Sequence, residues 1–144
     1  TKGGADLIGI GLTSIGNGVD YYAQNFKDIP TYEEALDNGD LPVFKGYRLS
    51  DDDQLRQFVI MELMSNFSLN IKRVEEEFNV NFNEYFADAI EALQEFIEAE
   101  LVEITEDKIQ VSQTGTMLIR NICMPFDAYL NKIPEDKRRF SKTI

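Results

Sequence analysis

The sequence predicts a mainly α-helical protein with a small β-hairpin, and three patterns support this fold class. Apolar residues recur at helical spacing from Leu55 to Phe67, after an acidic turn that follows Ser50. Apolar and polar residues alternate on both sides of a polar turn at residues 105–108, which is typical of a hairpin. A continuous apolar run within residues 6–15 indicates one strand that is buried on both faces.

Composition and charge exclude several classes of function. The 144 residues include 14 Lys or Arg and 26 Asp or Glu, which gives a formal net charge of −12. An acidic surface of this size repels phosphate, so we expect no nucleic-acid partner. No apolar run is long enough to cross a bilayer and no signal segment opens the chain, so we expect a cytoplasmic protein without membrane contact.

The counts of cysteine and histidine remove further chemistry. Cys123 is the single cysteine and the sequence has no histidine. The chain therefore cannot form an internal disulfide, a catalytic triad with histidine or a histidine-based metal site. A cluster that needs three or four thiolates cannot be held by this chain alone. Cys123 is expected to be a small buried side chain within an apolar helix.

Residues 1–48 are expected to contain one strand and a connecting segment. The strand is the apolar run within residues 6–15, and its partners are expected upstream of Thr1, because one strand cannot form a sheet. Aromatic and turn-forming residues fill most of the segment that follows. Thr31 is expected to cap one short helical turn, which Asn38 and the glycine after it would end.

Residues 49–144 are expected to begin with three helices. The first covers residues 51–66, and the second follows Asn70 as its N-cap. The third covers residues 83–98, has a continuous apolar stripe and would begin at Asn83.

The hairpin and a closing helix complete this second part. Thr114 is expected to cap the last helix, which Pro125 would interrupt. Three helices, a hairpin and a closing helix make the order of a winged-helix-like domain.

A winged-helix order is compatible with DNA binding, but the charges oppose it. The expected recognition helix, residues 83–98, has no Lys or Arg. Helices that enter the major groove usually neutralise phosphates and offer Arg, Lys, Asn or Gln to the bases. Its acidic residues are Glu84, Asp88, Glu91, Glu95 and Glu98. We therefore expect the fold to serve a structural or protein-contact role.

Two further features keep more than one interpretation. Gly9 and Gly11 suggest a dinucleotide fingerprint, but Ser14 stands where the third glycine should be. The two glycines fit either close strand packing with a turn, or the end of a barrel strand beside a nucleotide-like ligand. Arg120 interrupts an apolar helix, and it fits either an ion pair with an acidic residue or contact with an anionic ligand.

Four stretches of the sequence resemble the C-terminal part of the bacterial oxygen-independent coproporphyrinogen III oxidases, a radical S-adenosylmethionine (SAM) family. They are residues 6–15 (DLIGIGLTSI), 22–25 (YAQN), 120–127 (RNICMPFD) and 140–144 (FSKTI). The resemblance extends over nearly the whole chain in the same order. It implies that residues 1–48 are the last strand and the linker of a truncated radical SAM barrel, and that residues 49–144 are a helical, winged-helix-like domain beside the barrel mouth.

The resemblance also implies an activity for the intact parent. An enzyme of this family acts in haem biosynthesis and converts two propionates of coproporphyrinogen III to vinyl groups, which gives protoporphyrinogen IX. It uses S-adenosylmethionine and a [4Fe–4S] cluster on a C-x-x-x-C-x-x-C loop, and that loop is absent from this sequence. We therefore expect this chain to bind no cluster and to be inactive alone. Its main partner would be the missing N-terminal barrel of the same chain, and as a fragment it is expected to self-associate.

Site residues follow partly from the resemblance and partly from the sequence itself. The family likeness implies that Ile15 contacts S-adenosylmethionine, and it carries over no catalytic residue. Our own inference places Arg120, Arg138 and Arg139 near the carboxylates of the porphyrinogen substrate. The alternative function is a non-catalytic winged-helix module, either a transcription regulator or a haem-trafficking relative.

Overall fold

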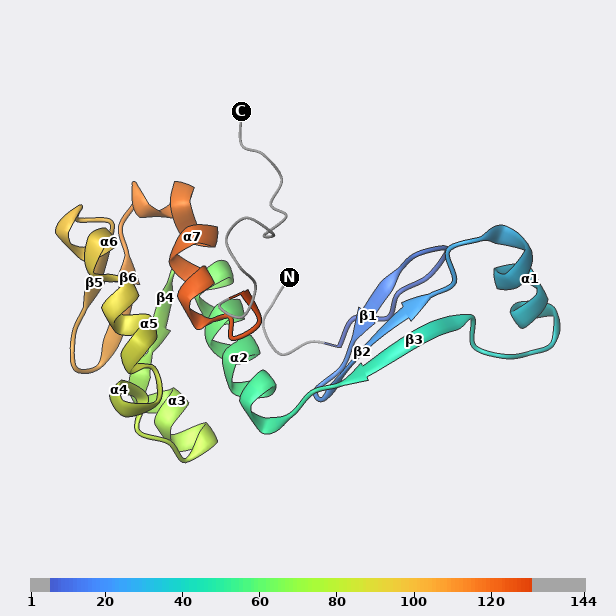
Figure 1. The fold of residues 1–144 in the computed structure, drawn as a ribbon, viewed down its shortest axis with the longest axis horizontal. Coiled ribbons are helices and arrows are strands. Elements are labelled where there is room, and N and C mark those ends of the chain that lie inside the picture. The colour runs from blue at the N-terminus through green and yellow to red at the C-terminus, as the bar shows by residue number, and fades with distance from the viewer. Residues whose placement is uncertain (1–5, 131–144) are drawn as a thin grey trace. The chain divides into compact units, whose positions relative to one another are not determined.

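The computed structural model describes residues 6–130 and has two compact units, which meet in the sequence between Gln54 and Leu55. It is a mixed α/β structure, which corrects the prediction of a mainly helical protein with one hairpin. The described residues form two three-stranded sheets, one in each unit. Figure 1 shows the order of helices and strands along the chain. No helix within residues 6–130 is both long enough and apolar enough to cross a membrane.

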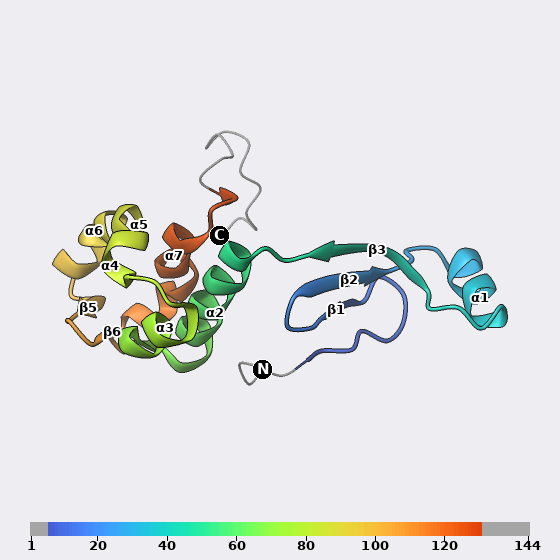
Figure 2. The same ribbon diagram turned by 90° about the horizontal axis from the view of Figure 1, so that it is seen from below.

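The sheet of the first unit is antiparallel throughout. Its strands are β1 (Ile15–Asn17), β2 (Tyr21–Asn25) and β3 (Val43–Arg48), with β2 in the middle. Figure 2 shows this order and the helix α1 (Ile29–Asp37) beyond one end of the strands. The segment that the sequence predicted to be a linker therefore holds two of the three strands, because β2 and β3 satisfy their backbone groups by pairing with each other.

The strand predicted within residues 6–15 is wrong for most of its length. Leu7 makes an isolated bridge to Asn17, and the regular strand starts only at Ile15. The chain turns between these points, with Gly11 at φ +93° and Thr13 at φ +61°, and an extended strand cannot pass through such positive angles. The side chains of this segment are also largely exposed rather than buried on both faces.

Helix α1 begins one turn earlier than the sequence predicted. Its N-cap is Asp28 and not Thr31, because a carboxylate oxygen of Asp28 accepts hydrogen bonds from the backbone N–H and the hydroxyl of Thr31 at 3.0 and 2.6 Å. These hydrogen bonds lower the pKa of the Asp28 carboxyl. The helix ends as predicted, at Asn38 followed by Gly39 with φ +78°.

Helix α2 (Asp51–Asn66) has the predicted bounds. Ser50 caps it, because the Asp53 N–H donates to the Ser50 hydroxyl at 3.2 Å and the Ser50 N–H donates back to the Asp53 carboxylate at 3.0 Å. This reciprocal pair is a capping box with Asp in the place of the usual Glu.

The next helix is also confirmed, but the long third helix is not. Helix α3 (Ile71–Phe78) has Asn70 as its N-cap. The helix predicted over residues 83–98 is three short helices: α4 (Phe82–Tyr85), α5 (Ala87–Ala92) and α6 (Gln94–Glu98). The N-cap of α4 is Asn81 rather than Asn83, since the Asn81 side chain accepts from the Glu84 N–H at 3.0 Å.

The breaks in this helical segment coincide with apolar residues that point into the core. Phe86 and Leu93 are the caps between the short helices, and both are buried.

The predicted hairpin is confirmed as β5 (Val102–Ile104) and β6 (Lys108–Val111). A third strand, β4 (Ser68–Asn70), pairs with the other side of β6. The closing segment runs through a 3-10 turn η1 (Gly115–Leu118), helix α7 (Ile119–Cys123) and a second 3-10 turn η2 (Met124–Phe126). Thr114 occupies the predicted N-cap position, before η1, but its side chain makes no capping hydrogen bond.

The apolar core of the second unit joins its helices to its sheet. Phe86 lies between Phe82 and Phe126, with ring centroids 4.9 and 5.3 Å apart. The large side chains that are almost completely buried are Phe82, Phe86, Phe126, Leu63, Leu69, Ile71, Leu93, Ile109, Ile122, Val59 and Val74. The hairpin is thereby anchored to the helices by β-branched and aromatic packing.

Candidate functional site

The strongest candidate site is a structured loop, which we call the glycine loop (residues 9–15). Asn25 holds this loop from inside: its side-chain amide donates to the carbonyl oxygens of Gly9 at 3.2 Å and Gly11 at 2.9 Å. The backbone N–H of Asn25 donates to the Ser14 carbonyl at 2.9 Å. Asn25 is only 7% exposed, so these bonds are shielded from competing water.

Further hydrogen bonds join the glycine loop to the segment after β2. The Thr13 N–H donates to the Phe26 carbonyl at 2.9 Å, and the Gly11 N–H donates to the Tyr32 hydroxyl at 3.2 Å. The Ser14 hydroxyl donates to the Ile10 carbonyl at 2.5 Å, across the turn itself. The loop therefore has a defined conformation although its outer side chains face solvent.

The glycines of this region serve close packing of the backbone on itself. A Cβ on Gly9 would lie 2.9 Å from the Cβ of Ser14, and a Cβ on Gly16 would lie 2.8 Å from the Leu7 carbonyl oxygen. Both distances are shorter than real Cβ contacts. This geometry supports the interpretation of close packing with a turn, and it gives no dinucleotide fingerprint.

Ile15 leaves the glycine loop as the first residue of β1, where it pairs with Gln24. Its side chain is 55% exposed, and those of Ile8 and Ile10 are 81% and 86% exposed. Ile8, Ile10 and Ile15 thus give the glycine loop an exposed apolar surface.

The predicted substrate residues have unequal support. Arg120 lies on α7 with an exposed side chain, and no ion pair or side-chain hydrogen bond is found for it among residues 6–130. The expected pairing of Arg120 with an acidic residue is therefore not seen in the described residues. Arg138 and Arg139 lie outside the residues that the structure describes.

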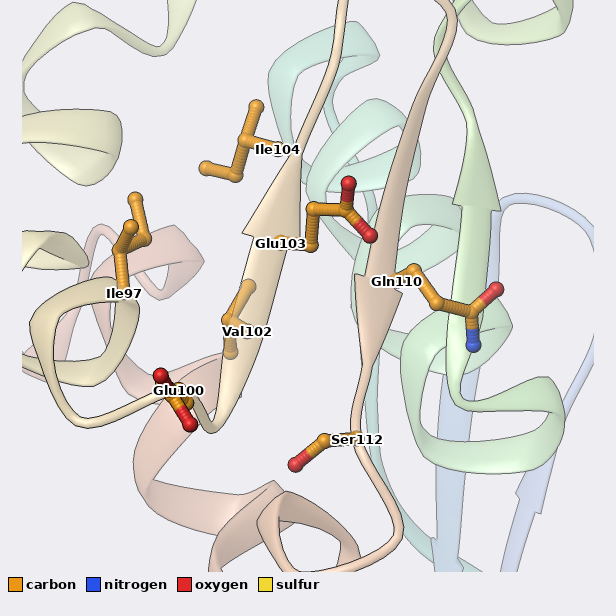
Figure 3. A pocket seen from close by; sticks show the side chains of 7 residues that line it. All are labelled: Ile97, Glu100, Val102, Glu103, Ile104, Gln110 and Ser112. Atoms are coloured by element: carbon orange, nitrogen blue, oxygen red, sulfur yellow. The ribbon is translucent and has the colours of Figure 1, made fainter.

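A pocket of about 410 Å³ beside the hairpin was not predicted from the sequence. Figure 3 shows its lining: Ile97, Glu100, Val102, Glu103, Ile104, Gln110 and Ser112. Two carboxylates and no basic side chain face this pocket, so it does not suit the anionic propionates of a porphyrinogen. Only the packing of α6 beside β5 creates it, and no local sequence signal could have revealed it.

The described residues contain no metal centre. No group of three or more Cys, Asp or Glu side chains within residues 6–130 could hold a metal ion, and Cys123 is the only cysteine of the sequence. A [4Fe–4S] cluster takes three or four thiolates. The residues of this chain therefore do not fit the cluster that the family resemblance implies for the parent.

Cys123 is buried in the second unit, as predicted, and burial raises the pKa of its thiol from 9.0 to about 11. At pH 8.5 we therefore expect iodoacetamide to alkylate Cys123 at least about tenfold more slowly in the native chain than in guanidinium, because the thiolate is the nucleophile. Mass spectrometry of timed samples measures both alkylation rates. Equal rates in the native and the unfolded chain would contradict the burial of Cys123.

The same pKa shift sets a pH dependence of stability. Because the pKa is raised in the folded state, the contribution of the neutral thiol is complete below about pH 9 and is lost as the pH rises toward 11.

Comparisons with known proteins agree on one family. Residues 49–118 match the family model described as the HemN C-terminal domain. The whole chain is 46% identical to an oxygen-independent coproporphyrinogen III oxidase of Helicobacter pylori and 37% identical to that of Pseudomonas aeruginosa. The chain spans about a third, 31%, of the length of these curated relatives.

A solved structure supports the same family at the level of the fold. It is described as coproporphyrinogen III oxidase (HemN) from Escherichia coli, a radical SAM enzyme. The match has a TM-score of 0.82 at 38% identity and covers 89% of this chain and 30% of that one. Residues 49–118 therefore carry a HemN C-terminal domain, and the chain as a whole is similar in sequence and in fold to part of the oxygen-independent coproporphyrinogen III oxidases.

Proposed function

We propose that this chain is the C-terminal portion of an enzyme that decarboxylates two propionates of coproporphyrinogen III to vinyl groups and so produces protoporphyrinogen IX. The observation that carries the proposal is the similarity of the whole chain to oxidases of that name, at 46% identity for the Helicobacter pylori relative. The shared fold at a TM-score of 0.82 supports it.

Within that enzyme, residues 1–48 adjoin the upstream barrel and residues 49–144 form the domain that shapes the substrate cavity. The exposed apolar side chains of Ile8 and Ile10 support the first assignment, since such side chains are usually covered in a native protein. The strand order β4-β6-β5 beside several short helices supports a winged-helix-like second domain.

Ile15 packs against the adenosyl group of S-adenosylmethionine in this proposal. Its exposed side chain and the close-packed backbone of the glycine loop are what support this role. Arg120 contacts a substrate carboxylate in this proposal. Its side chain is exposed and forms no ion pair with the described residues, which supports this role. Arg138 and Arg139 are proposed for the same contacts from the sequence alone.

This chain alone is proposed to be inactive. The cluster and S-adenosylmethionine supply the one-electron chemistry in the parent, and this chain has one buried cysteine to offer. Its own residues contribute binding surface, orientation and the exclusion of water.

The test compares this chain with a longer protein that contains it together with the upstream residues. Both are purified without oxygen and reconstituted with iron and sulfide. The longer protein is expected to show iron–sulfur absorbance, to release deoxyadenosine from S-adenosylmethionine and to consume coproporphyrinogen III. This chain is expected to do none of these.

Two results would overturn the proposal. The first is a reconstituted longer protein that binds a cluster but consumes no porphyrinogen, which would favour a haem-trafficking role. The second is deoxyadenosine release by this chain alone, which would contradict its proposed inactivity.

A further inference from the structure

Asn25 differs from the other polar side chains of the first unit in its burial and in the number of loop atoms that it holds. Asn25 and Asp53 are the two buried polar or charged residues among those described, and Asp53 belongs to the cap of α2. Through its side chain and backbone, Asn25 donates to three carbonyl groups of the glycine loop, those of Gly9, Gly11 and Ser14.

The glycine loop needs hydrogen-bond donors such as those of Asn25, because part of its backbone has an unfavourable conformation. Thr13 has φ +61°, a left-handed conformation that is unfavourable for a residue with a Cβ. A conformation of this kind persists only where the surroundings determine it. The Gly9 and Gly11 carbonyls, on either side of Ile10, both point to the same side-chain nitrogen of Asn25.

The position of Ile15 depends directly on this arrangement. Ile15 follows Ser14, whose carbonyl accepts from the Asn25 N–H at 2.9 Å, and its backbone carbon lies against the Gly9 side of the loop. If the carbonyls of Gly9 and Gly11 lost their donor, the turn could relax and Ile15 would move with it.

We infer that Asn25 is a positioning residue, which does not touch S-adenosylmethionine itself but holds the glycine loop so that Ile15 meets the adenosyl group. The inference rests on the proposed function. Asn25 thus determines how tightly S-adenosylmethionine binds and leaves the chemical step to other groups.

The test uses the longer protein that contains the upstream residues, with Asn25→Asp and Asn25→Ala. Aspartate has the size of asparagine, but its ionised side chain has no N–H and places negative charge beside two carbonyl oxygens. Each variant is expected to raise the dissociation constant of S-adenosylmethionine about tenfold, which corresponds to the loss of one or two buried hydrogen bonds. Hydrogen exchange of residues 9–15 is expected to become faster without any cofactor present.

The split between binding and turnover separates positioning from general damage. At saturating S-adenosylmethionine, kcat is expected to stay within about twofold of the unsubstituted protein, and the iron–sulfur absorbance is expected not to change. Ser50→Ala is the control, because it removes the cap of α2 in the same unit without touching the glycine loop. It is expected to lower thermal stability and to leave the dissociation constant unchanged.

The possible failures are distinguishable. If the unsubstituted longer protein does not bind S-adenosylmethionine, the proposed function is overturned and this inference falls with it. If that protein binds and both Asn25 variants bind equally well, this inference alone is overturned. Should Asn25→Ala not fold, the isosteric Asn25→Asp decides the question.

Discussion

Phe86→Ala is expected to lower the free energy of unfolding of the second unit by about 4 kcal/mol. The side chain of Phe86 is buried between the rings of Phe82 and Phe126, at centroid distances of 4.9 and 5.3 Å. The guanidinium of Arg56 lies 5.4 Å from the same ring centroid. The ring centroid of Tyr85 lies 5.1 Å from that of Phe86 as well. Truncation therefore removes apolar burial, three aromatic contacts and one cation–π contact at once.

Native-state hydrogen exchange in increasing urea measures this loss, because it reports on α5 and β6 separately from the first unit. Met117→Ala is the control: Met117 belongs to the same unit, but its side chain is 86% exposed. That variant is expected to change the free energy by less than about 0.5 kcal/mol. A loss below about 1 kcal/mol for Phe86→Ala would contradict the packing described for this core.

Helices α2 and α3 were predictable from sequence because their capping signals are local. Ser50 and Asn70 are polar residues immediately before apolar helical patterns, and both are the observed caps. The prediction of Asn83 as a cap is wrong because Asn81, two residues earlier, is an equally good cap residue and accepts the hydrogen bond from the Glu84 N–H. The apolar stripe also concealed the breaks near Phe86, since a continuous stripe gives no sign of where a helix bends.

The first unit was less predictable because its order comes from pairing between distant residues. Strand β3 is exposed at every position. Its sequence, VFKGYR, also has no alternation of apolar and polar side chains that would predict a strand. It pairs with β2 across the intervening helix α1, and no local pattern specifies that pairing. The apolar run near Ile10 predicts burial, but among residues 6–130 nothing covers Ile8 and Ile10, which are largely exposed.

The candidate site shows the same division between local and distant information. The role of Ile15 as a cofactor contact comes from the family resemblance, which carries structural information that this single sequence does not contain. The role of Asn25 was not visible, because it requires that residue 25 lie beside residues 9 and 11. Gly11 is a residue type that permits a turn, but no sequence signal predicts the left-handed conformation of Thr13 two residues later.

Gly115→Ala is expected to destabilise the second unit by about 3 kcal/mol, for a steric reason. Gly115 is buried at the start of η1, and a Cβ there would overlap the carbonyl oxygen of Leu101 and lie 2.9 Å from a methyl carbon of Val111. The Leu101 carbonyl cannot easily move, because it accepts the Ser112 N–H at 2.9 Å. The Gly115 N–H in turn donates to the Ser112 hydroxyl at 3.1 Å, which holds Gly115 from the other side.

Gly46→Ala provides the matched glycine control for this experiment. A Cβ on Gly46 would be 3.6 Å from the Tyr22 carbonyl oxygen, which is an ordinary van der Waals contact, and no positive φ opposes the substitution. Its stability is therefore expected to equal or slightly exceed that of the unsubstituted chain, because alanine restricts the unfolded state. Urea unfolding followed by circular dichroism compares the two variants. If Gly115→Ala were as stable as Gly46→Ala, the backbone of η1 could not lie as close to Leu101 as described, and the junction between the hairpin and α7 would have to be looser.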